Sequence, residues 1–202
     1  MALNREDLML KFVIISALFF TTMIYGEPGD FTLGGRTTLS TFGHDTSPGL
    51  GTGGVFRIRF FDSLNSEWFA DYVTSNISDL AFRRDAHIGW SVLFYPFNTK
   101  PQSFVPYFLA GHCFDYTEVA AIKTTSNKVN RWSSAIQAGI GSHYYITPDV
   151  DFSLTTQYML HLGDDIHAEI NGNTVNITRS SLSLEGHLLF TLSAKYRILK
   201  LW

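Results

Sequence analysis

The segment at residues 181–196, SLSLEGHLLFTLSAKY, alternates apolar and polar positions, with Leu189 as the apolar exception on the polar face. Its even positions are apolar or small, whereas its odd positions include Glu185, His187 and Lys195. A period of two places successive side chains on opposite faces of a β-strand. The segment therefore predicts a long strand with one apolar face and one polar, charged face.

The same alternation recurs seven more times after residue 26, and helical spacing of apolar residues nowhere persists beyond a turn or two. We therefore predict an all-β chain of eight strands, at residues 30–42, 53–61, 67–74, 85–96, 105–116, 131–146, 150–162 and 181–196. In the fifth of these both faces are largely apolar, so its orientation stays open.

The connections between these strands alternate in length. DSLNS, FNTKPQS and TPD are short, whereas GHDTSPGLGT, EVAAIKTTSNKV and GDDIHAEINGNTVNITRS are longer and polar. Short turns at one end and long loops at the other are typical of an up-and-down transmembrane barrel. The glycine-rich stretch that begins at Gly49 is expected to lie in one of the long loops.

Three features indicate that the apolar faces point outward into lipid. Several strands reach ten or more residues, which matches the roughly 9 to 11 that cross a bilayer at a tilt. The polar faces carry whole charges, and a turn centred near Leu64 would set Arg57 directly opposite Asp71. The lumen of an eight-stranded barrel is narrow and must be filled by side chains that satisfy one another.

The third feature is the placement of aromatic residues on the apolar faces near the strand ends, where ring side chains favour the headgroup level. Trp132, Tyr116 and Tyr158 lie toward the loops; Trp68, Phe60, Phe94, Tyr144 and Tyr196 lie toward the turns. A soluble lipocalin-like barrel would also alternate, but with its apolar face inward.

The inward polar faces predict a structural network in the lumen. Its expected members are Arg36, Arg57, Arg59, Glu67, Asp71, Gln137, Gln157, Glu185 and His187. We expect these residues to fill the lumen and to pair with one another, with no catalytic or metal-binding role.

The N-terminal segment, residues 1–26, predicts a signal peptide. Lys11 precedes an unbroken apolar run at residues 12–20, and the chain turns polar after Gly26. Glu6 and Asp7 offset Arg5, so translation is expected to start at Met9. The barrel domain is then expected at residues 28–202.

Composition narrows the partners of the chain. With 202 residues, a net charge of −3 and only 16% charged residues, it has no basic footprint for nucleic acid. The single Cys113 cannot form an internal disulfide. We expect one domain that is held together without covalent crosslinks or a cofactor, and that acts as a monomer.

The segments VPYFLAGHCFDY and AIQAGIGSHYYITPDVDFSLTTQYML, with an aromatic final strand that ends at Trp202, resemble the small outer-membrane β-barrel family of the OmpA transmembrane domain and OmpX-like proteins. The resemblance covers nearly all of residues 28–202 and implies a bacterial outer-membrane location among lipid. Trp202, Ile198 and Tyr196 also resemble the C-terminal signal read by the outer-membrane assembly machinery, from which Lys200 departs.

Candidate chemistry is sparse. His87, His143, His161 and His187 fall on inward faces, and a rim site of His44, Asp85, His87, His161 and Asp164 would be the place to look for a hydrolase. No HExxH, Gly-x-Ser-x-Gly or clustered Cys/His spacing is present.

We therefore expect a non-enzymatic barrel whose four surface loops serve envelope integrity, adhesion or binding of a partner. Two alternatives stay open. One is a porin-like or lipocalin-like barrel for small molecules, and the other is the rim hydrolase.

Overall fold

The computed structural model describes residues 27–41, 48–97, 104–123, 127–183 and 186–202. The expected signal peptide at residues 1–26 lies outside these residues. The strands are β1 (Asp30–Thr41), β2 (Gly49–Phe61), β3 (Leu64–Ile77), β4 (Ala81–Phe94), β5 (Phe104–Ala121), β6 (Lys128–Thr147), β7 (Val150–Asn171), β8 (Thr174–Ser183) and β9 (Gly186–Lys200). In the described part of the chain no helix is long and apolar enough to span a membrane.

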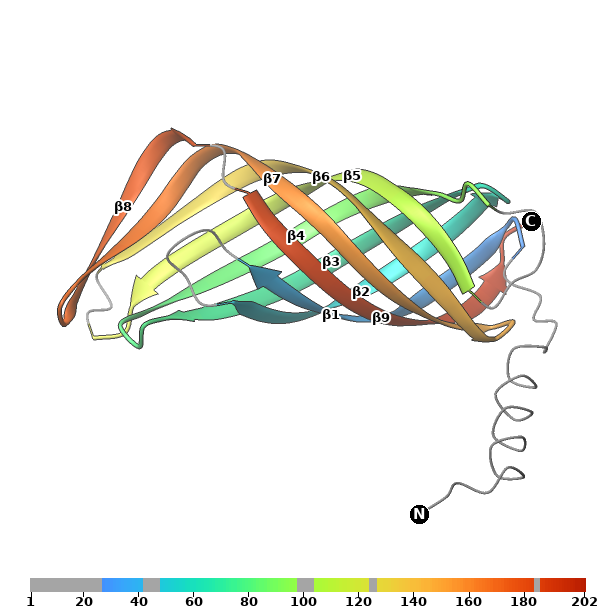
Figure 1. Cartoon of the computed structure of the whole chain (residues 1–202), viewed down its shortest axis with the longest axis horizontal. Coiled ribbons are helices and arrows are strands. Elements are labelled where there is room, and N and C mark those ends of the chain that lie inside the picture. Colours follow the sequence, from blue (N-terminus) through green and yellow to red (C-terminus); the bar gives the residue numbers. More distant parts are fainter. Residues whose placement is uncertain (1–26, 42–47, 98–103, 124–126, 184–185) are drawn as a thin grey trace, which may run out of the picture.

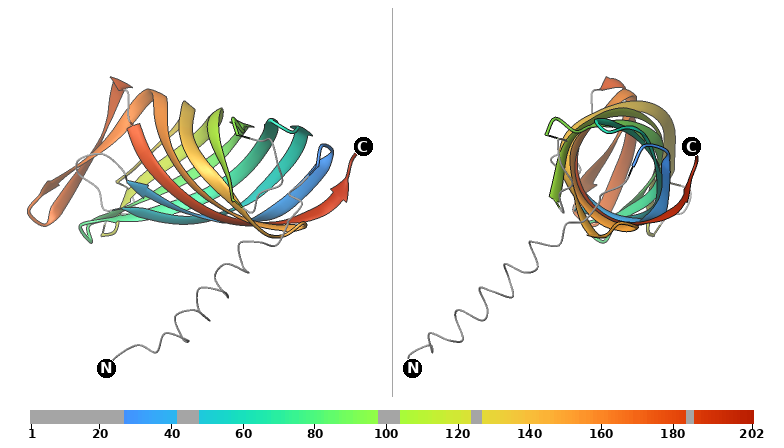
Figure 2. Two further views of the ribbon diagram at one scale, coloured as in Figure 1. Left: turned by 45° about the vertical axis from the view of Figure 1, so that its right-hand side comes forward. Right: turned by 90° about the vertical axis from the view of Figure 1, so that its right-hand side faces the viewer.

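Eight of these strands close a barrel, which confirms the predicted fold. Each strand from β1 to β6 pairs antiparallel with the next, and β9 pairs with both β7 and β1. Figure 2 shows the closed ring when the barrel is viewed along its axis. The β2–β3 and β6–β7 turns lie at one end, called the turn end here, together with the C-terminus (Figure 1).

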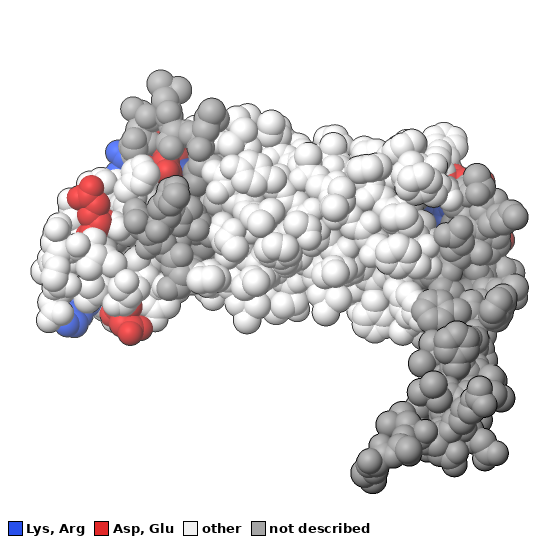
Figure 3. All heavy atoms as spheres, viewed as in Figure 1, with Lys and Arg blue, Asp and Glu red and all other residues white. Residues whose placement is uncertain are grey.

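The alternation predicted from the sequence sets which side chains face outward. The apolar side chains are between 44% and 60% exposed at Leu33, Trp68, Ile88, Ile140 and Leu154. Arg57, on the polar face of β2, is only 3% exposed. This is the reverse of a lipocalin-like barrel, in which the apolar face lines an internal cavity. Figure 3 shows that the middle of the visible wall carries no charged residue at its surface.

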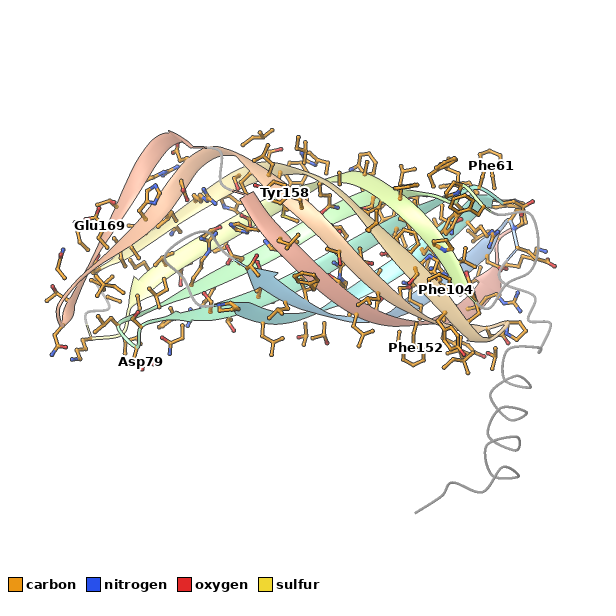
Figure 4. All side chains as sticks on the ribbon, viewed as in Figure 1. Phe61, Asp79, Phe104, Phe152, Tyr158 and Glu169 are labelled. Atoms are coloured by element: carbon orange, nitrogen blue, oxygen red, sulfur yellow. The ribbon has the colours of Figure 1, made fainter. Side chains whose placement is uncertain are left out.

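The height of this apolar wall matches a bilayer. On β6 the exposed aromatic residues Trp132 and Tyr144 are 12 positions apart (144 − 132). At about 3.3 Å per residue and a tilt of about 45°, they are separated by about 28 Å along the barrel axis. The hydrocarbon core of a bilayer is roughly 30 Å thick. Figure 4 shows Phe104 and Phe152 pointing outward in the turn-end half of the wall.

The long loops expected at the other end are largely strands, which corrects the prediction. β5 continues to Ala121, β6 begins at Lys128, and residues 163–180 belong to the β7–β8 hairpin. The β3–β4 connection is only three residues long, with Ser78 and Asp79 at positive φ. The glycine-rich stretch from Gly49 lies in β2 rather than in a loop, because it pairs with both β1 and β3.

The eighth predicted strand, at residues 181–196, is divided in the structure. β8 ends at Ser183 and pairs with the outer half of β7, whereas β9 begins at Gly186 and completes the barrel wall. β8 therefore occupies one edge of the sheet and belongs to a hairpin that projects beyond the barrel (Figure 1).

Candidate functional site

The lumen begins at the turn end with a balanced set of buried charges. The Arg57 guanidinium donates to both carboxylate oxygens of Asp151, at 2.6 and 3.3 Å. The Lys195 ammonium lies 3.1 Å from Glu67 and 3.7 Å from Asp151. Two cations thus face two carboxylates, which satisfies each charge in a site with little access to water. A hollow of about 10 Å³ beside Arg57 holds no more than one water molecule.

The predicted pairing of Arg57 with Asp71 is wrong. A bulge between Arg59 and Phe61 and a turn at Asp62 and Ser63 set Arg57 opposite Glu67 and leave Asp71 opposite Gly53. The partner of Arg57 instead comes from β7, across the lumen.

The next part of the lumen is apolar, which the prediction of a purely polar lumen missed. Val55, Phe69, Cys113, Ala135, Met159 and Leu189 form one buried cluster from six different strands. The Cys113 sulfur lies 3.7 Å from that of Met159. Such a layer disfavours passage of ions, because a desolvated ion finds no polar partner among these apolar side chains.

Polar contacts border this apolar cluster. Gln157 donates to Gln137 at 3.1 Å, and Gln137 donates to Ser91 at 2.8 Å. Arg36 pairs with Asp71 at 3.1 Å, and its guanidinium lies 4.3 Å from the centre of the Phe69 ring.

The expected network residues that the structure describes therefore face the lumen. Arg36, Arg57, Arg59, Asp71, Gln137, Gln157 and His187 are at most 7% exposed, and the Glu67 side chain is 13% exposed. Arg59 lies 3.6 Å from Asp62 at the turn end. Glu185 lies outside the described residues. The structural role assigned to this set stays a prediction.

The four inward histidines are fully buried, but they do not form an open rim site. His143 contacts Arg57 and Tyr95 in the turn-end half of the lumen. His87 and His161 both lie against Asp115, at 3.2 and 3.1 Å, and the His187 ring centre is 4.5 Å from that of His161. Of the remaining rim candidates, Asp85 is buried against Arg83, Asp164 is half-buried, and His44 is not among the described residues.

Asp115 is a residue that sequence reasoning missed. It lies on the fifth predicted strand, where both faces are largely apolar, so the sequence pattern could not identify the face that points inward. In the structure the odd-numbered residues of β5 from Val105 to Val119 point inward, with Gly111 the half-buried exception, so Asp115 shares the lumen with the histidines.

Beyond Tyr116 and Trp132 the strands continue into a structure that we call the crown, residues 75–84, 117–123, 127–131 and 163–179. Its interior is an apolar cluster that includes Ile77, Val119, Ile166 and Ile177. The crown surface carries exposed charged residues, among them Asp79 and Glu169, which Figure 4 shows at the end opposite the turns.

Polar contacts fasten the β7–β8 hairpin to the rest of the crown. Arg131 on β6 donates to the main-chain carbonyl of Asp164 and lies 3.4 Å from the Asp165 carboxylate. The Asn127 amide donates to the carbonyl of Val175 at 3.0 Å. The crown is therefore a packed extension of the barrel, and β8 is its edge strand.

No protein-family model matches the chain, and a search of curated proteins finds no significant relative. Solved structures are similar in fold. A major outer membrane protein from Thermus thermophilus has a TM-score of 0.58 at 11% identity, covering 83% of this chain and 99% of its own. Neisserial surface protein A has a TM-score of 0.57 at 14% identity, covering 84% and 96%. The outer membrane protein OprG from Pseudomonas aeruginosa has a TM-score of 0.54 at 17% identity, covering 87% and 100%.

Proposed function

From the fold of the small outer-membrane β-barrels, which this chain has, we propose that it is a non-enzymatic outer-membrane protein that holds a binding crown on a sealed barrel. The crown faces the outside of the cell and binds a partner there, in adhesion or in maintenance of the envelope. The short turns and the C-terminus face the periplasm, as in other barrels of this type.

One observation carries this proposal: the lumen is filled, while the strands extend far beyond the apolar wall. β7 has 22 residues, about twice the number that a bilayer crossing requires. Ion pairs and an apolar cluster fill the lumen. This filling removes a conducting path, and it also makes the barrel wall rigid. Extending paired strands past the membrane then supports a surface that a flexible loop would not hold in place.

The absence of an accessible catalytic constellation among the described residues supports a binding role. Asp85, His87 and His161, which could have formed a rim hydrolase, are all at most 1% exposed beneath the crown. A substrate would have to displace the crown interior in order to reach them.

Epitope insertion on intact cells tests the location and the orientation. We expect an epitope placed between Gly172 and Asn173 in the β7–β8 turn to bind antibody on unbroken cells. The same epitope between Pro148 and Asp149 in the β6–β7 turn should bind only after the outer membrane is opened. The reverse pattern, or recovery of the chain in the soluble fraction without a gel shift on boiling, contradicts the proposal.

Planar-bilayer recording tests the sealed lumen. We expect no steady conductance above the bare membrane for the wild-type barrel. The matched variant Phe69→Ala with Met159→Ala shortens two side chains of the apolar cluster and should admit small-ion current. A wild-type conductance comparable to that of a porin would replace the binding role with a transport role.

A second candidate function, passage of small apolar molecules, is favoured by a hollow of about 380 Å³ on the outer wall near the turn end. Phe97, Phe104, Phe108, Ile140 and Leu154 are among its lining residues. The Tyr107 ring lines it from within and donates or accepts a hydrogen bond with Thr155 at 2.6 Å. Faster uptake of an alkane by the Tyr107→Ala barrel than by wild type would support this role.

A further inference from the structure

We propose that His87, Asp115 and His161 bind a divalent transition-metal ion such as Zn²⁺ within the lumen below the crown. The three residues come from β4, β5 and β7, and each offers one ligand atom within 4.8 Å of the others. The role proposed for the crown neither requires nor supplies this site.

The separations fit a metal ion. The His87 Nε2 atom lies 3.2 Å from one oxygen of Asp115, and the His161 Nδ1 atom lies 3.1 Å from the other. Around Zn²⁺ with bonds of about 2.1 Å, tetrahedral ligand atoms are about 3.4 Å apart. The longest separation in the set, at most 4.8 Å, requires an approach of about 1.4 Å at most. A rotation of the imidazole rings supplies a movement of that size.

Several polar atoms of this cluster lack a hydrogen-bond partner among the described residues, although the His161 Nδ1 atom lies 3.3 Å from the Ser133 hydroxyl. Both ring nitrogens of His87, Nε2 of His161 and Oδ1 of Asp115 are buried without a hydrogen bond of good geometry among the described residues. Buried polar atoms in native proteins nearly always have a partner, and an exception points to a bound water or ion. Here the unsatisfied atoms belong to the three residues that each offer one ligand atom within 4.8 Å of the others.

The charged residues around the cluster are compatible with a bound cation. Asp71 pairs with Arg36, and Asp85 pairs with Arg83. Asp115 contacts His87 and His161 and accepts hydrogen bonds from the hydroxyls of Thr117 and Ser133. A cation bound beside this carboxylate would neutralise its negative charge.

The ligand types select the ion. Two imidazoles and one carboxylate suit Zn²⁺, Co²⁺, Ni²⁺ or Cu²⁺, whereas Mg²⁺ and Ca²⁺ require oxygen ligands. The His187 ring, 4.5 Å from the centre of the His161 ring, lies close enough to contribute to the surroundings of the ion. An ion at this point would tie three strands together across the lumen.

Cobalt binding to the tag-free barrel tests the proposal. The chain is folded into detergent either in the presence of Co²⁺ or before Co²⁺ is added, and free metal is then removed. Both arms are needed because the site is enclosed and an ion could enter only during folding. We expect one ion per barrel in at least one arm, the visible absorption bands of four-coordinate Co²⁺, and their loss when Zn²⁺ replaces it; Mg²⁺ should have no effect.

Variants assign the ligands. Asp115→Asn and His161→Gln should each weaken binding at least about tenfold, and Zn²⁺ should no longer raise the temperature at which the folded gel band disappears. His143→Gln, which alters a buried lumen histidine outside the cluster, should bind as wild type does. His167→Ala controls for the crown, where an exposed His167 lies 3.4 Å from Asp165.

Folding of each variant is established first by its gel shift on boiling. Failure of the wild-type barrel to retain Co²⁺ or Zn²⁺ in either arm overturns the proposal. Loss of binding in His167→Ala but not in His161→Gln overturns it equally, because the ion would then lie on the crown.

Discussion

Removing the Asp151 carboxylate should destabilise the barrel strongly, because it unbalances the buried charges at the turn end. Asp151→Asn leaves Arg57 and Lys195 facing Glu67 alone, so one positive charge is buried without a counter-charge. It also replaces an acceptor of two guanidinium hydrogen bonds, at 2.6 and 3.3 Å. Breaking a buried ion pair from one side costs about 3 to 5 kcal/mol of unfolding free energy.

The double variant Arg57→Met with Asp151→Leu separates the effect of charge balance from that of packing. It removes one cation and one anion, and Lys195 and Glu67 still pair at 3.1 Å. Replacing a whole buried ion pair with apolar residues of similar volume is often close to neutral. We therefore expect the double variant to be more stable than Asp151→Asn, although it changes twice as many residues.

Urea unfolding of the barrel in lipid vesicles, followed by tryptophan fluorescence and by the gel shift, measures both free energies. A loss below about 1 kcal/mol for Asp151→Asn would refute the reasoning, since the charge would then be hydrated rather than buried. A double variant less stable than the single one would also refute it, because packing rather than charge would dominate.

Three further outcomes follow from the structure. Gly89→Val should prevent folding, as judged by the gel shift, because a Cβ at Gly89 lies 2.5 Å from the Cβ of Cys113. Trp132→Ala, at a side chain 71% exposed toward the headgroups, should lower the unfolding free energy by about 1 kcal/mol in vesicles, more than the same change costs in a detergent micelle. The hydrogen bond from Lys128 holds the pKa of the Glu118 carboxyl in the crown below its usual 4.5. This contact therefore stabilises the crown above pH 4.5, and the stabilisation is lost as the pH falls through the lowered pKa of Glu118. Amide hydrogen exchange in the β5–β6 hairpin should accelerate in that acidic range in wild type but not in Glu118→Gln.

The alternation of residues predicted the barrel and the direction of most side chains, because a period of two is a local property of the chain. It could not predict the partners in the lumen. Arg57 meets Asp151, 94 positions away, since inward side chains of a narrow barrel meet across its axis rather than only along a hairpin. The bulge between Arg59 and Phe61 then moved the hairpin register, and with it the expected Arg57–Asp71 pair.

The strand ends were predicted least well, because their apolar contacts also join residues that are far apart in the sequence. Polar residues at 163–180 indicated a loop, but here they form a hairpin whose two isoleucines pack in an apolar cluster shared with β3, β4 and β5. Ile166 and Ile177 are each flanked by polar residues in the sequence, so neither indicates an apolar face by itself. The apolar face forms only when β7 and β8 pair, which sets Ile177 opposite Ala168.

The crown depends physically on the filled barrel beneath it. A hairpin of two strands is only marginally stable in water by itself. The β7–β8 hairpin is held because β7 is one continuous strand from Val150 to Asn171, and its inner half is paired on both sides in the barrel wall. Balanced charges and the apolar cluster fix the position of that inner half. A change such as Asp151→Asn should therefore weaken the crown as well as the barrel, although no atom of the crown is altered.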